Sequence, residues 1–421
     1  MIETVITGRN GGTLTTSTAY NDDNVKTSET DANGNVTTYT YGPCWEATTD
    51  ALNNVFKNEY FLDGRIKNVK VNGAVKDYYT YEIIGNELIE IKHASEAEWE
   101  KTVMAFDGNV RQKSYPDGYV QSFVYDEFGR QTCVEDNCNN KTESIYSLTT
   151  GDIFRQWRNG VLTEFASGHA ADAETDEIYQ YDRSYSFYQG ERVLISETRT
   201  YRSGLKTREF DSGNVRIASK KYNGNGETKE HISENGVETN NVYQNERLNS
   251  AENKTNGMIT YAHDEFNRDL GYDYTEDDID KSIRYALDDN GNILSMTQSA
   301  GEQSRTLSYE FDALNRLKKE TTPEGIINNT IYDAQGNIIE LSGGVYPQKY
   351  EYDIQARLIS VMTYRNSDLS SETIFEYDNR GRLKKRKYAD DSFETFAYRG
   401  DGNIREIVNA RGQTVRISYD M

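Results

Sequence analysis

Apolar and polar residues alternate along much of this chain with the two-residue period of a β-strand. In residues 307–311 and 414–419, alternate side chains are apolar or aromatic; Val415, Ile417 and Tyr419 fall on one face of the second segment. Such runs are about six to eight residues long and are separated by turn residues, without a convincing helical period. The pattern predicts an all-β protein built from short hairpins.

The predicted strands belong to a repeated unit that starts with an aromatic residue followed by Asp. It reads Tyr/Phe-Asp-x-x-Gly/Asn/Ala-Arg/Asn-Leu/Ile and recurs about every 20 residues, with occasional loop insertions. The residues that define its clearest copies are Tyr125, Asp126, Gly129, Arg130, Phe311, Asp312, Tyr332, Asp333, Gly336, Tyr352, Asp353, Tyr377, Asp378, Gly381, Tyr398 and Gly402. We interpret residues 1–421 as one repeat array, clear at 20–130 and 263–421 and degenerate at 146–262.

Weaker copies extend the register towards the N-terminus. In the first part of the chain we place the aromatic position at Tyr41, Tyr60, Tyr81 and Phe106. A second turn lies half-way along each unit, as at 115–118 and 322–325, so each unit supplies two strands.

Each position of the unit has a structural role to fill. We expect the aromatic residue to end a strand on its buried face and to stack on its counterparts in adjacent units. The Asp should accept hydrogen bonds from backbone N–H groups and so fix the turn. Gly or Asn should supply a positive φ, and Leu or Ile should return the chain to the buried face. None of these roles requires a substrate.

Composition supports a folded chain with few residues of the usual core types. Only 35% of the residues are hydrophobic, but there are 32 Tyr and 14 Phe and only 4 Pro, whereas disordered chains are poor in aromatic residues and rich in Pro. Tyr therefore serves as the buried residue. The net charge of -22 argues against nucleic acid as a partner, and no apolar run is long enough to span a membrane.

These units resemble the YD repeats of the Rhs family, which also includes the C components of bacterial Tc toxins and the teneurins. The resemblance covers nearly the whole chain and is strongest at 106–130 and 263–421. It implies a continuous β-ribbon that curves and spirals into part of a hollow shell, which in bacterial members encloses a toxin. The family's self-cleaving Asp-Pro-x-Gly-Leu segment has no match, because Pro43, Pro116, Pro323 and Pro347 follow Gly, Tyr, Thr and Tyr. We therefore predict no catalytic residue and no cofactor.

For the other candidate sites, a structural role explains the residues better than a functional one. The acidic cluster of residues 273–280 could bind Ca²⁺, but a solvated loop insertion explains it better. Cys133 and Cys138 have no partnering Cys or His pair at zinc spacing, so we predict no metal site. The basic run 384–387 lies in a predicted strand, whose alternate side chains point to opposite faces, so it cannot form one patch.

Two functions remain open. The first is a non-catalytic shell segment that encloses or presents another polypeptide; the second is an adhesion or carbohydrate-binding module that uses exposed aromatic rows. We expect a protein cargo or an adjoining chain at open β-edges, with a glycan as the other candidate partner. We expect a secreted or cell-surface location, in a bacterium, although this chain shows no signal peptide.

Overall fold

The computed structural model describes residues 2–8, 11–172, 177–188, 190–201, 206–211, 216–233, 237–244, 246–253, 257–344, 346–365 and 370–419. These residues form strands and turns and contain no helix. The 38 strands make one sheet in which each strand pairs with the next in antiparallel orientation. The all-β fold predicted from the two-residue period is therefore confirmed.

The first part of the sheet contains β1 (Ile2–Thr7), β2 (Thr13–Tyr20), β3 (Lys26–Thr30), β4 (Val36–Gly42), β5 (Trp45–Thr49), β6 (Val55–Tyr60), β7 (Ile66–Val71), β8 (Ala74–Ile84), β9 (Glu87–His93), β10 (Trp99–Ala105), β11 (Val110–Ser114), β12 (Val120–Tyr125), β13 (Gln131–Asp136) and β14 (Lys141–Tyr146). The middle part contains β15 (Ile153–Arg158), β16 (Val161–Ala171), β17 (Ile178–Tyr188), β18 (Glu191–Tyr201), β19 (Lys206–Phe210), β20 (Arg216–Tyr222), β21 (Thr228–Ile232), β22 (Glu238–Gln244), β23 (Arg247–Asn253) and β24 (Gly257–His263).

The last part contains β25 (Asp269–Glu276), β26 (Ile279–Leu287), β27 (Ile293–Ala300), β28 (Gln303–Phe311), β29 (Leu317–Thr321), β30 (Ile327–Tyr332), β31 (Ile338–Gly343), β32 (Gln348–Tyr352), β33 (Leu358–Tyr364), β34 (Ser370–Tyr377), β35 (Leu383–Lys387), β36 (Phe393–Tyr398), β37 (Ile404–Val408) and β38 (Thr414–Arg416).

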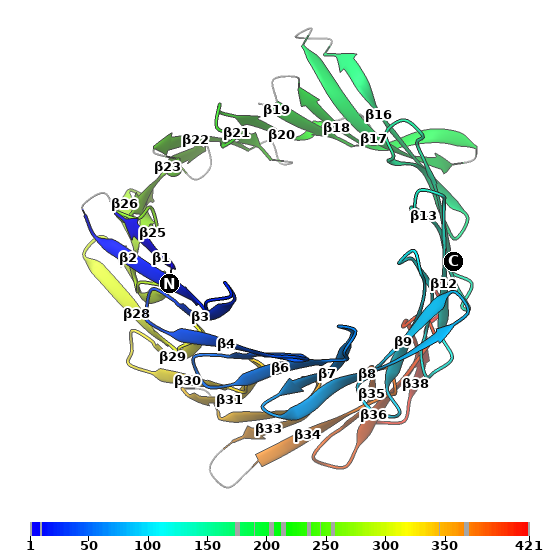
Figure 1. Cartoon of the computed structure of the whole chain (residues 1–421). Coiled ribbons are helices and arrows are strands. Elements are labelled where there is room, and N and C mark those ends of the chain that lie inside the picture. Colours follow the sequence, from blue (N-terminus) through cyan, green and yellow to red (C-terminus); the bar gives the residue numbers. More distant parts are fainter. Residues whose placement is uncertain are drawn as a thin grey trace.

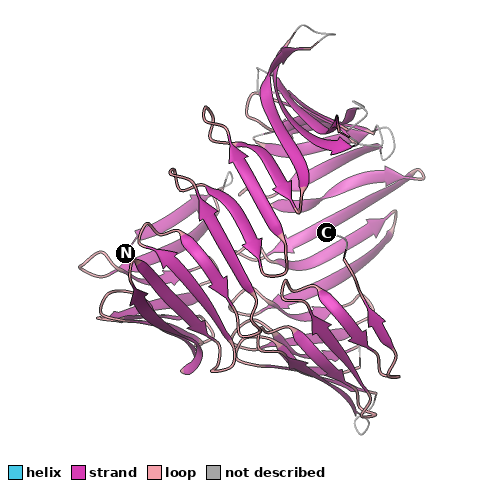
Figure 2. Cartoon of the chain, turned by 90° about the vertical axis from the view of Figure 1, so that its right-hand side faces the viewer, coloured by secondary structure: helices cyan, strands magenta, loops and turns pink. Residues whose placement is uncertain are grey.

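The sheet is a ribbon that curves into a spiral. In Figure 1 it runs round a ring, and the strands of the last part, β25 to β38, pass beside those of the first part. Figure 2 shows the same ribbon from the side, with the strands of successive turns of the spiral one above the other. We call residues 2–152 the first turn of the spiral and residues 264–419 the second turn.

Consecutive hairpin turns alternate between the two edges of the ribbon, because every pair of neighbouring strands is antiparallel. We call one edge the motif rim; its turns include 61–65, 105–109, 126–130, 147–152, 264–268, 288–292, 312–316, 333–337, 353–357, 378–382 and 399–403. The other edge is the plain rim; its turns include 8–12, 31–35, 50–54, 94–98, 115–119, 136–140, 277–278, 301–302, 322–326, 388–392 and 409–413.

A recurrent β-bulge accounts for the curvature. At the motif turn that follows β28, Phe311 pairs with Leu317 but Glu310 pairs with Lys319, so Lys318 is an extra residue. The same one-residue shift follows Tyr332, Tyr352, Tyr377 and Tyr398 in the second turn of the spiral. A bulge bends its strand and increases the local twist. Repetition of one bend on one rim makes the ribbon spiral.

Side chains of the ribbon cover one another along each face instead of filling a thick core. In β28, Leu307, Tyr309 and Phe311 are half-buried while Ser308 and Glu310 are exposed, as the alternation predicts. The buried apolar side chains of the described residues are few: Ala47, Val71, Ile89, Val103, Tyr119, Tyr179, Tyr201 and Phe210.

The strands at the two ends of the ribbon have less support. Among the described residues, β1 pairs with β2 alone and β38 pairs with β37 alone. The exposed side chains of β1 include Ile2, Val5 and Ile6, and Val415 of β38 is 56% exposed. An open β-edge is therefore present at each end of the described sheet.

Candidate functional site

The Asp of each repeat holds its own turn through both carboxylate oxygens. Asp312 Oδ1 accepts hydrogen bonds from the backbone N–H groups of Leu314, at 2.9 Å, and Arg316, at 3.0 Å. Its Oδ2 accepts one from Nε of Arg316 at 2.7 Å. Burial raises the pKa of Asp312, but the hydrogen bonds from Arg316 outweigh it and hold the pKa below its ordinary value. The carboxylate is thus used in building the turn.

The other motif aspartates have equivalent contacts in their own turns. Asp126, Asp264, Asp353 and Asp378 each accept hydrogen bonds from the backbone and side chain of the Arg four residues later. In the turn of Asp333 an Asn takes the place of Arg. The residue just before this Arg or Asn has a positive φ. Examples in the described motif turns are Gly129, Gly336, Gly381, Gly402, Asn315 and Ala356.

The motif Arg joins one repeat to the next, a role that the sequence interpretation did not assign. Arg316 donates from Nη1 to the carbonyl oxygen of Asp333 at 3.2 Å, and its guanidinium lies 4.5 Å from the ring centroid of Tyr332. Arg382 makes the same two contacts with Arg399, at 3.1 Å, and with Tyr398, at 4.8 Å. Each of these Arg side chains therefore bridges two successive motif turns.

The motif aromatics pack differently from our expectation. We expected them to stack on one another in adjacent units, but Tyr332, Tyr377 and Tyr398 lie under the Arg of the preceding unit. Their hydroxyls also donate to carbonyl oxygens of that unit; for Tyr332 this is Leu317 O at 2.8 Å. The guanidinium group, and not another aromatic ring, covers the face of the Tyr ring. It can lie flat on this ring while the same Arg stays bound to its Asp.

Two early copies are shifted from their predicted alignment. The residue that pairs across the turn before Val110 is Met104, not Phe106, and Phe106 lies in the turn itself with 65% of its surface exposed. Tyr81 lies within β8, before the turn after Ile84. The predicted aromatic position is therefore wrong in these two copies, because each has an aromatic residue near, but not at, the end of the strand.

The two turns of the spiral meet at a seam between the motif rim of the second turn and the plain rim of the first. Arg357 binds Glu98 through Nη1, at 2.8 Å, and Nη2, at 3.2 Å, while its Nε holds Asp353. Arg382 likewise binds both Asp378 and Asp117, at 2.7 and 3.0 Å. The motif Arg therefore bonds one turn of the spiral to the other.

Polar contacts continue along the seam in both directions. Asn290 donates to Asp31 at 2.7 Å, and Asn33 donates to Asp288 at 2.9 Å, so the two turns exchange hydrogen bonds. Farther along, Asn140 donates to Asp401 at 3.2 Å. These contacts join residues that are more than 250 positions apart in sequence.

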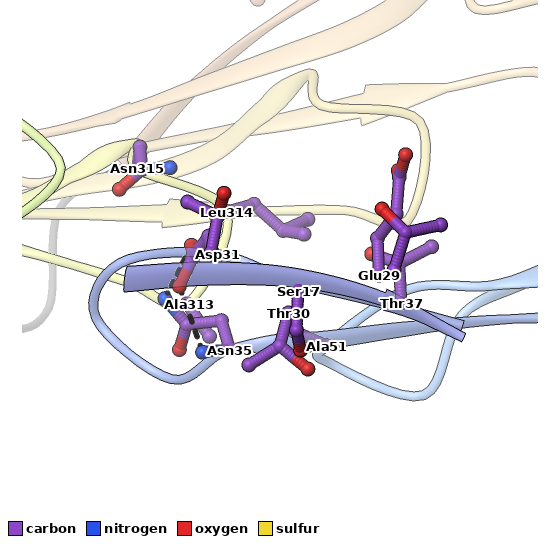
Figure 3. Close-up of a pocket in the computed structure, with 12 residues that line it drawn as sticks. Ser17, Glu29, Thr30, Asp31, Asn35, Thr37, Ala51, Ala313, Leu314 and Asn315 are labelled. Carbon is purple, nitrogen blue, oxygen red and sulfur yellow. Dashed lines mark hydrogen bonds between the residues drawn. The ribbon is translucent and has the colours of Figure 1, made fainter. Parts of the chain in front are cut away.

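A cavity of about 400 Å³ lies at the seam (Figure 3). Leu314 and Asn315 of a second-turn motif turn line it, together with Thr37 and Ala51 of the first turn. Leu314 is half-buried there. An apolar residue at the tip of a motif turn is thus accommodated by small and polar residues of the facing strands.

The acidic and cysteine residues that were weighed as metal candidates have structural roles or stand free. Within the acidic cluster, Asp273 pairs with Arg284, Glu276 pairs with Lys281, and Asp280 accepts from Thr275. No group of three or more His, Cys, Asp or Glu suited to a metal occurs among the described residues. Cys44, Cys133 and Cys138 carry free thiols.

The sequence interpretation missed a buried polar cluster in the degenerate region. Tyr201 is 1% exposed and donates to Asp172, which Arg208 also binds at 3.0 Å. Burial and the bond to Asp172 raise the pKa of Tyr201 to about 12. Nearby, Glu197 is 3% exposed and pairs with Arg183 and Arg199. No repeat pattern marks these residues; only their exceptional burial does.

A groove of about 820 Å³ also lies in this region, on the long strands β16 to β18 and the turn after β14. Phe154 and Phe165 line it along with Asp182, Arg183 and hydroxyl residues. The hydroxyl residues are Ser147, Thr149, Thr150, Ser167, Ser184, Ser196 and Thr198. Partly exposed rings beside many hydrogen-bonding groups can hold a polar ligand with an apolar face.

Comparison with known proteins gives one family and one shared fold. Residues 288–327 match the family model described as RHS Repeat. The crystal structure of TcdB2-TccC3-TEV is similar over 94% of this chain, with 12% identity and a TM-score of 0.51. A Tc holotoxin pore of Photorhabdus luminescens covers the same share, with 14% identity and a TM-score of 0.41. This chain spans 26% of each. No curated protein matches it. Within the described residues, no helix is long and apolar enough to cross a membrane.

Proposed function

We propose that this chain, which carries repeats of the RHS family, is a non-catalytic segment of a shell wall that encloses or presents another polypeptide. The observation that supports this most is the seam, because Arg357 and Arg382 fasten successive turns of one ribbon into a continuous wall. The Asp and Arg side chains that could have served as acids, bases or anion ligands are used in the turns and the seam. The interior of such a wall is then the functional surface.

A partner of this wall is a polypeptide and not a nucleic acid, since the net charge of -22 repels phosphate backbones. The crystal structure of TcdB2-TccC3-TEV, which shares the fold, joins TcdB2 and TccC3. For the present chain we propose by analogy a protein cargo or an adjoining chain. We also propose a secreted or cell-surface location in a bacterium.

Protease protection tests the enclosing role. A disordered reporter peptide is fused after Met421, and its cleavage rate by proteinase K is compared with that of the same reporter fused to a compact monomeric protein. We expect cleavage to be slower by about tenfold or more, because the surrounding wall restricts access to the reporter. Equal rates in the two fusions would refute the enclosing role. Pre-treatment with urea should remove the protection if the folded wall causes it.

The groove beside Phe154 and Phe165 favours a second candidate, carbohydrate binding. Sugar rings stack on aromatic side chains through their apolar C–H faces while hydroxyls satisfy their polar edges. A glycan array followed by calorimetry tests it. Binding that Phe154→Ala and Phe165→Ala both weaken would support a lectin role, and an array without signal would reject it.

A further inference from the structure

The motif rim of the first turn of the spiral carries a row of exposed apolar side chains. The tips of four of its turns present Leu62, Phe106, Phe128 and Leu148, which are 97%, 65%, 67% and 91% exposed. Scattered apolar residues are ordinary on a surface. These four differ because they all lie in hairpin turns of one edge, at 61–65, 105–109, 126–130 and 147–152.

In the second turn of the spiral, apolar residues at the tips of motif turns lie at the seam with the first turn. Its motif turns carry Phe266 and Leu314 at the tip, and both are half-buried. Leu314 lies at the seam beside Thr37 and Ala51 of the first turn. Next to Phe266, Glu265 accepts a hydrogen bond from Gly12 N at 3.1 Å across the seam. A motif turn therefore packs its tip against the plain rim of a neighbouring turn of the spiral.

The polar groups of the first-turn motif rim match the same arrangement. Arg130 holds Asp126, four residues before it, as Arg357 holds Asp353 in the second turn, and Arg65 pairs with Asp63, two residues before it. Arg357 and Arg382 show that such a guanidinium can bind a second carboxylate from a facing plain rim. Arg65 and Arg130 keep 35% and 24% of their side-chain surface exposed, compared with 21% for Arg357.

The plain rim of the second turn supplies the complementary surface. Its turns expose Asp277, Asp278, Glu302 and Glu324, which are acidic like Glu98 and Asp117 at the seam. The molecule therefore has two unstacked rims of opposite kind. One has apolar tips and Arg, and the other has carboxylates.

We propose that the motif rim of the first turn is an interaction surface that binds the plain rim of a second copy of this chain. This contact pairs a motif rim with a plain rim, as the seam does within one molecule, but it joins two molecules. Because the two surfaces are different, the assembly is head-to-tail and adds copies in one direction. Attraction between Arg and carboxylate fixes the orientation of the copies, and the apolar tips supply much of the affinity.

Sedimentation velocity over a concentration series at low salt tests the contact. The wild-type chain should form dimers and longer species, and added salt should weaken them. The rim variant combines Leu62→Ser, Phe106→Ser, Phe128→Ser and Leu148→Ser. We expect each lost tip to raise the dissociation constant roughly tenfold. These side chains are exposed, so the variant should keep the circular dichroism spectrum of the folded chain.

The matched control for the rim variant combines Val124→Ser and Ile145→Ser. These residues are 50% and 48% exposed but lie on strand faces, within β12 and β14 and not in a turn. They should leave association unchanged. Equal weakening by the rim and control variants would overturn the proposal, and so would a wild-type chain that stays monomeric at every concentration.

A mixing experiment tests the head-to-tail geometry. The plain-rim variant Glu302→Lys with Glu324→Lys should be monomeric, whereas Glu135→Lys with Glu351→Lys, on exposed strand positions, should associate normally. Mixed together, the rim variant and the plain-rim variant should form 1:1 dimers and nothing longer, because each retains one intact surface. Failure of the mixture to dimerise would overturn the geometry. None of these outcomes alters reporter protection, which depends on the interior of the wall.

Discussion

Removal of one motif carboxylate should open one hairpin and leave the rest of the ribbon folded. Asp312→Ala removes the acceptor for two backbone N–H groups and the anchor for Arg316. Both side chains are mostly buried, at 13% and 19% exposure, so solvent screens their pairing only in part. A charge-assisted hydrogen bond contributes about 1.5–3 kcal/mol and a neutral one about 1 kcal/mol. Partial replacement by water leaves an expected loss of roughly 2–4 kcal/mol.

Native-state hydrogen exchange followed by mass spectrometry is the assay, because each repeat mainly contacts its neighbours and local opening is measurable. A loss of about 3 kcal/mol makes exchange in β28 and β29 faster by roughly a hundredfold. Strands far along the ribbon, such as β12, should exchange at the wild-type rate. Arg316 also reaches Asp333 and Tyr332, so β30 should show a smaller increase.

The next turn of the ribbon provides a matched control. Thr322 opens a plain turn with the same backbone hydrogen bonds, but its hydroxyl accepts a long hydrogen bond, from Ile326 N at 3.3 Å, and carries no charge. We expect Thr322→Ala to cost less than about 1 kcal/mol. If Thr322→Ala and Asp312→Ala accelerate exchange equally, the carboxylate does not hold the turn and the reasoning fails.

Three further predictions concern pH, the seam and the buried cluster. Burial raises the pKa of Asp378, but hydrogen bonds from Arg382 and Arg380 hold it below its ordinary value. Its stabilisation is therefore complete above the unfolded pKa of about 3.9 and is lost as pH falls through the folded value; urea midpoints that stay flat on acidification would contradict this. A double-mutant cycle of Arg357→Ala and Glu98→Ala, followed by urea unfolding, should give a coupling of roughly 0.5–1 kcal/mol, because the pair is partly exposed; no coupling would show that the seam is passive. Tyr201→Phe should lower the free energy of unfolding by roughly 1–3 kcal/mol, because it leaves a buried oxygen of Asp172 with one partner fewer; calorimetry without a change would refute that role.

The turns could be predicted from sequence because their interactions are local. The Asp, the positive-φ residue and the Arg of one turn lie within five consecutive residues, so the pattern itself carries the geometry. The seam could not be predicted in the same way. Which plain turn faces Arg357 depends on the bend summed over every intervening hairpin, and a one-repeat error would exchange Glu98 for another residue.

The buried cluster shows a different limit. Asp172 and Tyr201 meet because β16, β17 and β18 are longer than most other strands of the ribbon. The sequence there lacks the repeat, so nothing signals which polar residues become buried. Burial in a single-layer ribbon depends on the neighbours that a side chain finds, more than on its own hydropathy.

The choice between Arg and Asn at the last turn position sets how strongly one repeat is tied to the next. Asn337 and Asn292 close their own turns by donating to Asp333 and Asp288, at 2.9 and 2.8 Å. Arg316 makes the equivalent bond and also reaches the following motif turn. Asn292 also reaches the following motif turn, where it donates to Oδ1 of Asn315 at 2.6 Å, but an Asn has no guanidinium to lie over the next aromatic ring as Arg316 lies over Tyr332. The order of Arg and Asn along the motif rim therefore sets which motif turns are also tied to the aromatic ring of the next unit, while the turns keep the same backbone hydrogen bonds.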